Sequence, residues 1–221
     1  MKLFVRRSGI FFLTLIITNL VLIGTAIGQR FAVTSGNWND PIWATTAAGV
    51  PGSAATPTAA NPVTINAGVT VTMNVAGNCS TLTLQAAAVS GSVITGASGL
   101  TIAGNITVNN TGTGASGAVL SSPLNLGAAN RTITVADDGT SAIDLTISGV
   151  ISGGANIGFT KTGAGTMVLS GSNTYTGTST ITGGTIQLGA AGDGTNTPLG
   201  TTTGRTVVGT GTSLDLNGFT L

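Results

Sequence analysis

The side chains able to do acid–base chemistry are few, and most gather in one part of the chain. Asp137, Asp138 and Asp144 lie between two basic residues, Arg131 and Lys161. Paired carboxylates hydrolyse glycosidic bonds when they stand at a suitable separation. Asp137 and Asp138 are adjacent, however, so on a strand their side chains would point to opposite faces. Because Gly139 follows them, the simpler interpretation is a turn. The sequence therefore predicts no catalytic residue here.

Other kinds of site are excluded by what the chain lacks. There is no histidine, so neither a Ser-His-Asp triad nor a Cys-His pair can exist. Cys79 is the one cysteine, which rules out an internal disulfide, and we predict it to be a small buried filler. Asp193 and Asn196, like the 137–139 turn, offer oxygen ligands, but calcium takes about six to eight of them. The sequence predicts no metal site and no cofactor.

The first residues have the order of a secretory signal peptide. Lys2, Arg6 and Arg7 precede an almost wholly apolar stretch, residues 10–23, and small residues end at Gly28. We predict cleavage after Gly28, the alternative being an uncleaved membrane anchor. Beyond it the basic residues are Arg30, Arg131, Lys161 and Arg205, against six aspartates. These few, scattered basic residues do not predict the clustered basic surface that binds nucleic acid.

Alternation of apolar and polar residues is the dominant pattern of the remaining chain. In residues 63–75 every second residue is apolar, and the others are mostly Thr or Asn. A period of two residues predicts β-strands with one apolar, buried face and one polar, solvent-exposed face. Shorter copies recur at 82–84, 100–102, 106–108, 124–126, 133–135, 145–147, 186–188 and 214–216. Turn formers such as Asn109-Asn110, Asp138-Gly139 and Gly183-Gly184 separate them.

Many short strands predict either a sandwich or a stacked coil. Similar units along the whole chain, an aromatic content of 4% and repeated Thr and Asn at polar positions favour a parallel β-helix. Residues 31–62 differ, with both tryptophans and four prolines. We expect them to form an N-terminal cap, with Trp38 and Trp43 packed over the first coil; the alternative is stacking on sugar rings.

An ordered motif occupies residues 158–189. Its members, in order, are Thr160, Lys161, Gly163, Gly165, Thr166, Leu169, Ser170, Gly171, Asn173, Thr174, Tyr175, Gly177, Gly184 and Thr185. This order resembles the autotransporter-associated β-strand repeat, also called the passenger-associated transport repeat, although Ile186 stands where the family has Leu. We expect Lys161 to lie on the outer face and Tyr175 to anchor a turn through its hydroxyl.

The resemblance implies a right-handed β-helix that is secreted or displayed at the bacterial cell surface and aids the transport and folding of a passenger. It does not imply a reaction, and we predict a protein that is not an enzyme. Its expected partner is the outer-membrane export machinery, or a C-terminal β-barrel that this chain does not include, and we expect a fragment ending in mid-pattern at Leu221. The alternatives are an adhesin for a surface glycan or protein and, less favoured, a β-helical polysaccharide-degrading enzyme. The predicted organisation is a signal peptide (1–28), a cap (29–62), coils (63–157) and the repeat region (158–221).

Overall fold

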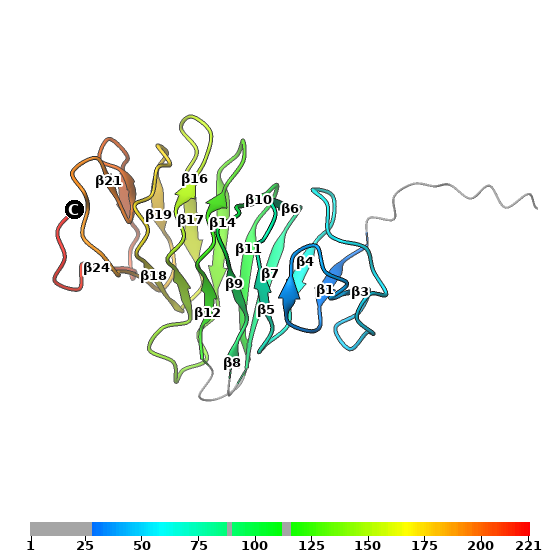
Figure 1. The fold of residues 1–221 in the computed structure, drawn as a ribbon. Coiled ribbons are helices and arrows are strands. Elements are labelled where there is room, and N and C mark those ends of the chain that lie inside the picture. Colours follow the sequence, from blue (N-terminus) through cyan, green and yellow to red (C-terminus); the bar gives the residue numbers. More distant parts are fainter. Residues whose placement is uncertain (1–27, 88–89, 112–115) are drawn as a thin grey trace, which may run out of the picture.

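The computed structural model describes residues 28–87, 90–111 and 116–221, in which the chain forms strands, turns and loops without a helix. Accordingly, no described segment is a helix that could span a membrane. The predicted signal peptide lies outside the described residues apart from Gly28. The predicted all-β class is confirmed (Figure 1).

Three parallel sheets form the sides of a β-solenoid of about six turns, which confirms the stacked coil. The ten-stranded sheet, here sheet A, contains β1 (Arg30–Ala32), β4 (Val63–Ile65), β7 (Leu82–Ala87), β11 (Ile106–Thr111), β14 (Arg131–Val135), β17 (Phe159–Thr162), β19 (Ser179–Ile181) and β23 (Thr206–Val208), with β3 (Trp43–Ala44) and β8 (Ser90–Gly91) paired antiparallel. The eight-stranded sheet B contains β2 (Gly36–Asn37), β5 (Thr70–Thr72), β9 (Val93–Thr95), β12 (Ala118–Leu120), β15 (Leu145–Ile147), β18 (Thr166–Leu169), β20 (Thr185–Leu188) and β24 (Ser213–Asp215). The four-stranded sheet C contains β6 (Gly77–Cys79), β10 (Leu100–Ile102), β13 (Leu124–Asn125) and β16 (Ile151–Ser152).

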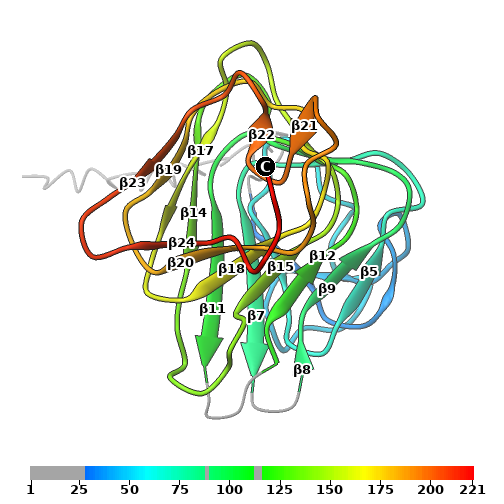
Figure 2. The ribbon, with the colours of Figure 1, turned by 90° about the vertical axis from the view of Figure 1, so that its left-hand side faces the viewer.

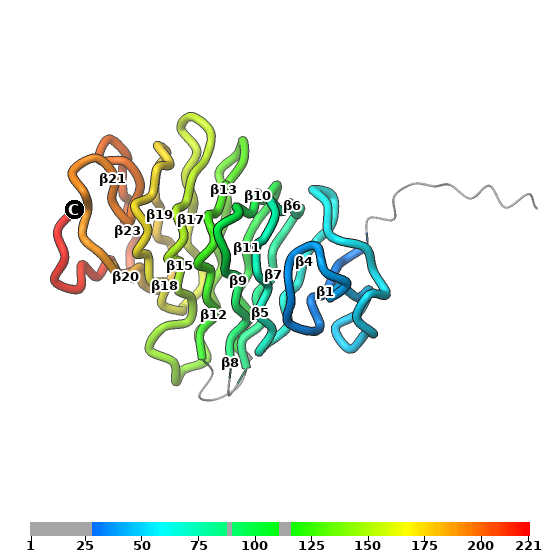
Figure 3. Tube along the Cα trace, in the orientation of Figure 1, coloured from blue at the N-terminus to red at the C-terminus, as the bar shows by residue number. Residues whose placement is uncertain are grey.

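The coils that start at β4, β7, β11 and β14 each visit the three sheets in turn. The coil that starts at β11, for example, continues through β12 and β13, and β14 then begins the next coil beside β11. Figure 2 shows this closed outline from the C-terminal end of the stack, and Figure 3 follows the trace from coil to coil. Side chains from all three sheets therefore point into one narrow interior.

The interior is filled by columns of aliphatic residues in register. In sheet A, Leu82 lies beside Ile106, and Ile106 beside Ile133. A column in sheet B contains Val71, Ile94, Leu120, Ile147, Leu169 and Leu188. These residues are fully buried, as the period-two pattern predicts, because alternate side chains on a strand share one face.

Threonines occupy the opposite face of sheet A. Thr83, Thr107, Thr134 and Thr162 lie beside one another in successive coils. The hydroxyl oxygens of Thr134 and Thr162 are 2.8 Å apart, which is a hydrogen bond. Like residues thus stack on like residues along the outer face.

The N-terminal segment contributes a first, partial coil. β1 and β2 pair in parallel with β4 and β5, and β3 covers the outer edge of β1. Trp38 and Trp43 are buried and meet edge to face, with ring centroids 4.9 Å apart, and the Trp43 indole N–H donates to the Trp38 carbonyl at 2.8 Å. The predicted packing of both rings is confirmed, and neither ring offers a face to a sugar.

The C-terminal end of the stack is more exposed. Val208 continues the inner column beside Ile181 but is 47% exposed, because β23 has no further described strand beyond it. A small hairpin of β21 (Asn196–Thr197) and β22 (Gly200–Thr201) lies near this end (Figure 1).

Candidate functional site

The motif of residues 160–185 spans two consecutive coils. Thr160 and Lys161 lie in β17, and Gly163 and Gly165 form the corner that leads into β18. Thr166 and Leu169 belong to β18, and Ser170 and Gly171 follow it. The segment that contains Asn173, Thr174, Tyr175 and Gly177 leads to β19, and Gly184 and Thr185 lead into β20. The structure therefore brings the motif together as one stacked unit.

Lys161 is buried, which corrects the predicted outer-face position. It pairs with Ile133 on one side and Ile181 on the other, so it occupies an aliphatic column of the interior, with 0% of its surface exposed. The alternation that buries Phe159 two residues earlier puts Lys161 on the same face. Sequence reasoning gave more weight to its charge than to its register.

The Lys161 ammonium donates to three backbone carbonyl oxygens. The distances from Nζ are 3.2 Å to Thr162, 3.0 Å to Gly163 and 2.9 Å to Gly183. Three donors meet three acceptors, so the buried ammonium is fully hydrogen-bonded. Because Gly183 lies in the next coil, this side chain joins the corners of two coils.

Burial lowers the pKa of Lys161 to about 8, since the charged form is poorly solvated in the interior; the Asp144 carboxylate partly offsets this effect. An ammonium held by neutral carbonyls keeps part of its desolvation cost. Its hydrogen bonds to backbone carbonyls give this side chain a structural role in joining two coils.

Gly163 allows the corner that surrounds the ammonium. Its φ of 78° lies in the left-handed region, where glycine has no steric penalty. A Cβ at this position would stand 2.2 Å from the Val135 carbonyl oxygen. The same oxygen accepts a hydrogen bond of 3.0 Å from the Gly165 N–H. The motif thus needs glycine here both for its turn and for close contact with the preceding coil.

Asn173 bridges neighbouring segments of backbone with its side chain. Its Oδ1 accepts from the Ile151 N–H at 2.7 Å, and its Nδ2 donates to the Pro198 carbonyl at 2.7 Å. The residue is fully buried. The Asn173 side-chain amide thus takes the place of a strand backbone as hydrogen-bond partner of β16, the last strand of sheet C.

A family model described as passenger-associated-transport-repeat matches residues 159–188. The chain carries a passenger-associated transport repeat. The matched segment begins with the first residue of β17 and ends with the last residue of β20, so the repeat is a structural unit of the solenoid. No curated protein and no solved structure matches the chain. The repeat and the β-solenoid together fit an autotransporter passenger-type segment.

Tyr175 is the aromatic centre of the passenger-associated transport repeat. It is fully buried and meets Phe159 edge to face, with ring centroids 5.5 Å apart. Its hydroxyl lies 2.7 Å from Ser179 Oγ, which donates to the Leu199 carbonyl at 3.2 Å. The predicted anchoring of a turn therefore runs through Ser179, and the hydroxyl does not itself reach backbone. Burial raises the pKa of Tyr175.

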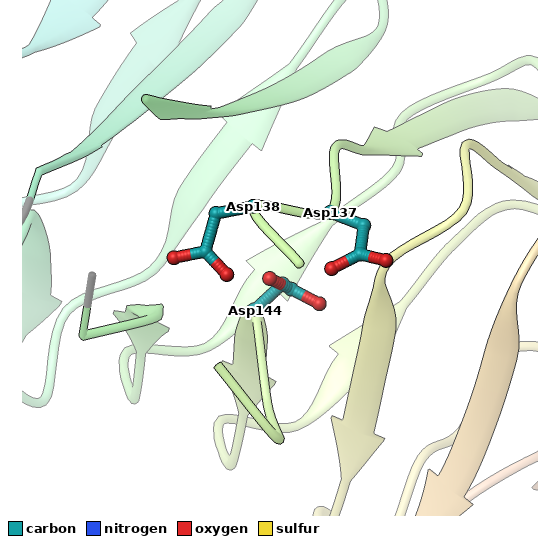
Figure 4. Close-up of side chains that lie close together, drawn as sticks. All are labelled: Asp137, Asp138 and Asp144. Atoms are coloured by element: carbon teal, nitrogen blue, oxygen red, sulfur yellow. The ribbon is translucent and has the colours of Figure 1, made fainter. Parts of the chain in front are cut away.

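The acidic residues outside the repeat lie in a corner between β14 and β15. Asp137 and Asp138 accept backbone hydrogen bonds from Gly139, Thr140 and Ser141, which confirms the predicted turn. Because they stand in a turn and not in a strand, their carboxylates do not diverge. Together with Asp144 each places an oxygen within 4.8 Å of the others (Figure 4).

The other candidates for acid–base chemistry do not join this corner. Arg131 donates to the carbonyls of Leu126, at 2.7 Å, and Ala103, at 2.6 Å, beside the opposite end of β14. Asp193 accepts from the N–H groups of Thr195 and Asn196 in a separate exposed turn. Cys79 is buried as predicted, and burial raises the pKa of its thiol to about 12.

Asn110 is a residue of the acidic corner that sequence reasoning missed. Asn109 and Asn110 were expected to form a turn, yet both lie in β11, paired with Gln85 and Ala86. Ile106, Val108 and Asn110 are alternate residues of β11, so all three side chains lie on its buried face, although Asn110 is polar. Extending the period-two pattern by two positions would have found it.

Proposed function

We propose that this chain is a non-catalytic β-solenoid passenger segment, exported across a bacterial outer membrane and displayed at the surface or secreted. In this proposal the passenger-associated transport repeat supports passenger folding during export. The observation that carries it is the set of side-chain bonds from the repeat to its neighbours. Lys161 reaches the coil that follows, and Asn173 reaches the coil that precedes it.

These bonds bear on folding because a solenoid is stabilised by contacts between adjacent coils. Folding begins where one coil interface is strong enough to hold a neighbour, and then propagates. The repeat supplies such an interface near the C-terminal end of the described stack. A chain that folds from there outside the membrane would resist backward movement through the export machinery, which is the proposed partner.

The test compares export with stability. In the exporting bacterium, Asn173→Ala is expected to lower the surface-exposed fraction, measured by protease accessibility of intact cells against total protein. The matched control is a series at Leu84, a fully buried residue of β7 outside the repeat, with Leu84→Val and Leu84→Ala chosen to match the loss of unfolding free energy. Equal export defects at equal stability would refute a special role for the repeat.

A binding role is the second candidate, and the threonine rows on the outer face of sheet A are the observation that favours it. Regularly spaced hydroxyls offer hydrogen bonds to an extended glycan or protein surface. Thr107→Val with Thr134→Val would then abolish adhesion while export stays normal. Unchanged adhesion in this variant would remove the sheet A face from consideration.

A further inference from the structure

Two columns of threonines lie side by side on the outer face of sheet A. Each of these residues is partly exposed. The first column contains Thr132, Thr160 and Thr180, and the second contains Thr83, Thr107, Thr134 and Thr162. The two columns, here called the threonine array, run over β7, β11, β14, β17 and β19, which stand side by side in Figure 1.

The threonine array is regular in two dimensions. Neighbouring strands of a sheet lie about 4.8 Å apart, and residues two apart on a parallel strand lie about 6.6 Å apart. Thr132 and Thr134 stand in this relation on β14, and their partners Thr160 and Thr162 do so on β17. Where both columns are present, the array is therefore a rectangular net in which every point carries one hydroxyl and one methyl group.

The chemistry of the threonine array narrows the class of partner. Lys161 lies between Thr160 and Thr162 in sequence but points into the interior, so it places no charge in the array. Both tryptophans and the one tyrosine are buried, so none of these rings offers a platform on which a sugar could stack. The strands β11, β14 and β17 have a partner on each side, so this face presents side chains and takes no additional strand.

We propose that the threonine array binds the surface of ice. A face that repeats one neutral side chain on a net is complementary to a partner whose hydrogen-bonding groups repeat on a similar net. Ice is such a partner, because the oxygen atoms of its prism face form a rectangular net with repeats close to both spacings of the array. The Thr134 and Thr162 hydroxyls bond to each other at 2.8 Å, and this pair keeps a proton and free lone pairs for water. The inference goes beyond the proposed function and does not depend on export.

The test uses the full chain, with ice itself as the probe. We expect the protein to be retained in a slowly growing ice front and to lower the freezing point of a seed crystal below its melting point. Thr134→Tyr interrupts the net at its centre and should remove most of both effects. The matched control is Thr146→Tyr, at a partly exposed position of β15 in sheet B that lies outside the array. It should keep both effects, and the Tm of each variant shows whether it is folded.

The unsubstituted protein can overturn the proposal without any variant, because it must be retained in ice and must lower the freezing point. Retention that a folded Thr134→Tyr leaves unchanged, or that folded Thr146→Tyr loses equally, also overturns it. A further arm measures binding to insoluble cellulose and chitin above the freezing point. Binding there that Thr134→Tyr abolishes, with no retention in ice, would assign the array to a glycan instead.

Discussion

The Lys161 ammonium lies 2.9 Å from the Gly183 carbonyl oxygen, so a side chain of β17 holds the corner of the following coil. This contact sits inside an otherwise aliphatic column, between Ile133 and Ile181. A charged residue of the repeat is therefore part of the core, where its protonation affects stability.

The stability of the protein should depend on pH through Lys161. Its pKa is about 8 in the folded chain, against an ordinary value of 10.5. Between these values the unfolded chain binds more protons than the folded chain, so stability rises with pH. From pH 7 to 9 the gain is about 1 kcal/mol. Below pH 8 both states are protonated and the cost of burying the ammonium is fully present.

Lys161→Met tests this dependence by urea unfolding at several pH values. The variant should lack the rise seen between pH 7 and 9. Burial raises the pKa values of Cys79 and Tyr175, so both groups lower stability at higher pH in both proteins, and the difference between the two curves isolates Lys161. Parallel curves would show that the lysine does not titrate in this range.

Asn173→Ala should strongly destabilise the solenoid. The substitution leaves the Ile151 N–H and the Pro198 carbonyl without their side-chain partner in a buried place. Each such group costs about 1–3 kcal/mol, so we expect a loss of about 2–5 kcal/mol in unfolding free energy. Thr174→Ala, at the exposed neighbour, is the control and should change stability by less than about 0.5 kcal/mol.

How far the sequence determines the fold is clearest in the columns. Leu82, Ile106 and Ile133 alternate with threonine, and that alternation alone places them inside. The same rule applied without exception would have buried Lys161 and Asn110. Both were misplaced because polarity was allowed to override register, although backbone carbonyls or a neighbouring carboxylate can satisfy a polar group inside a solenoid.

The acidic corner was less accessible from sequence. Asp137 and Asp144 are close because both lie in the loop that joins β14 of sheet A to β15 of sheet B. Asn110 lies near this loop because β11 pairs in register with β14. The size of each coil varies along the chain, so no fixed repeat length predicts this register. The contact between Asn110 and Asp144 therefore follows only from the strand pairing between coils.

Substituting two glycines with positive φ distinguishes the cost of backbone strain in a turn from the cost of a steric clash with a neighbouring coil. Gly163 has φ 78° and no room for a Cβ, whereas Gly194 has φ 89° and nothing within 4 Å. Gly194→Ala should cost about 1 kcal/mol from backbone strain alone. Gly163→Ala adds a clash with the Val135 carbonyl and should cost roughly 3 kcal/mol or more. Chemical unfolding measures both, and equal losses would mean that the corner relaxes without penalty.

Cys79 reports on whether the N-terminal coils open independently of the repeat. The thiol is fully buried in β6, and its pKa is raised to about 12 by burial, so at pH 8 it is neither exposed nor ionised. A thiol reagent should label the folded chain slowly and the unfolded chain at once. If coils are coupled mainly to their neighbours, Gly163→Ala weakens a distant part of the stack and should leave the labelling rate unchanged. Trp43→Phe, which removes the indole bond to the Trp38 carbonyl beside the first coils, should raise it. Equal acceleration by both variants would show that the described solenoid unfolds as one cooperative unit.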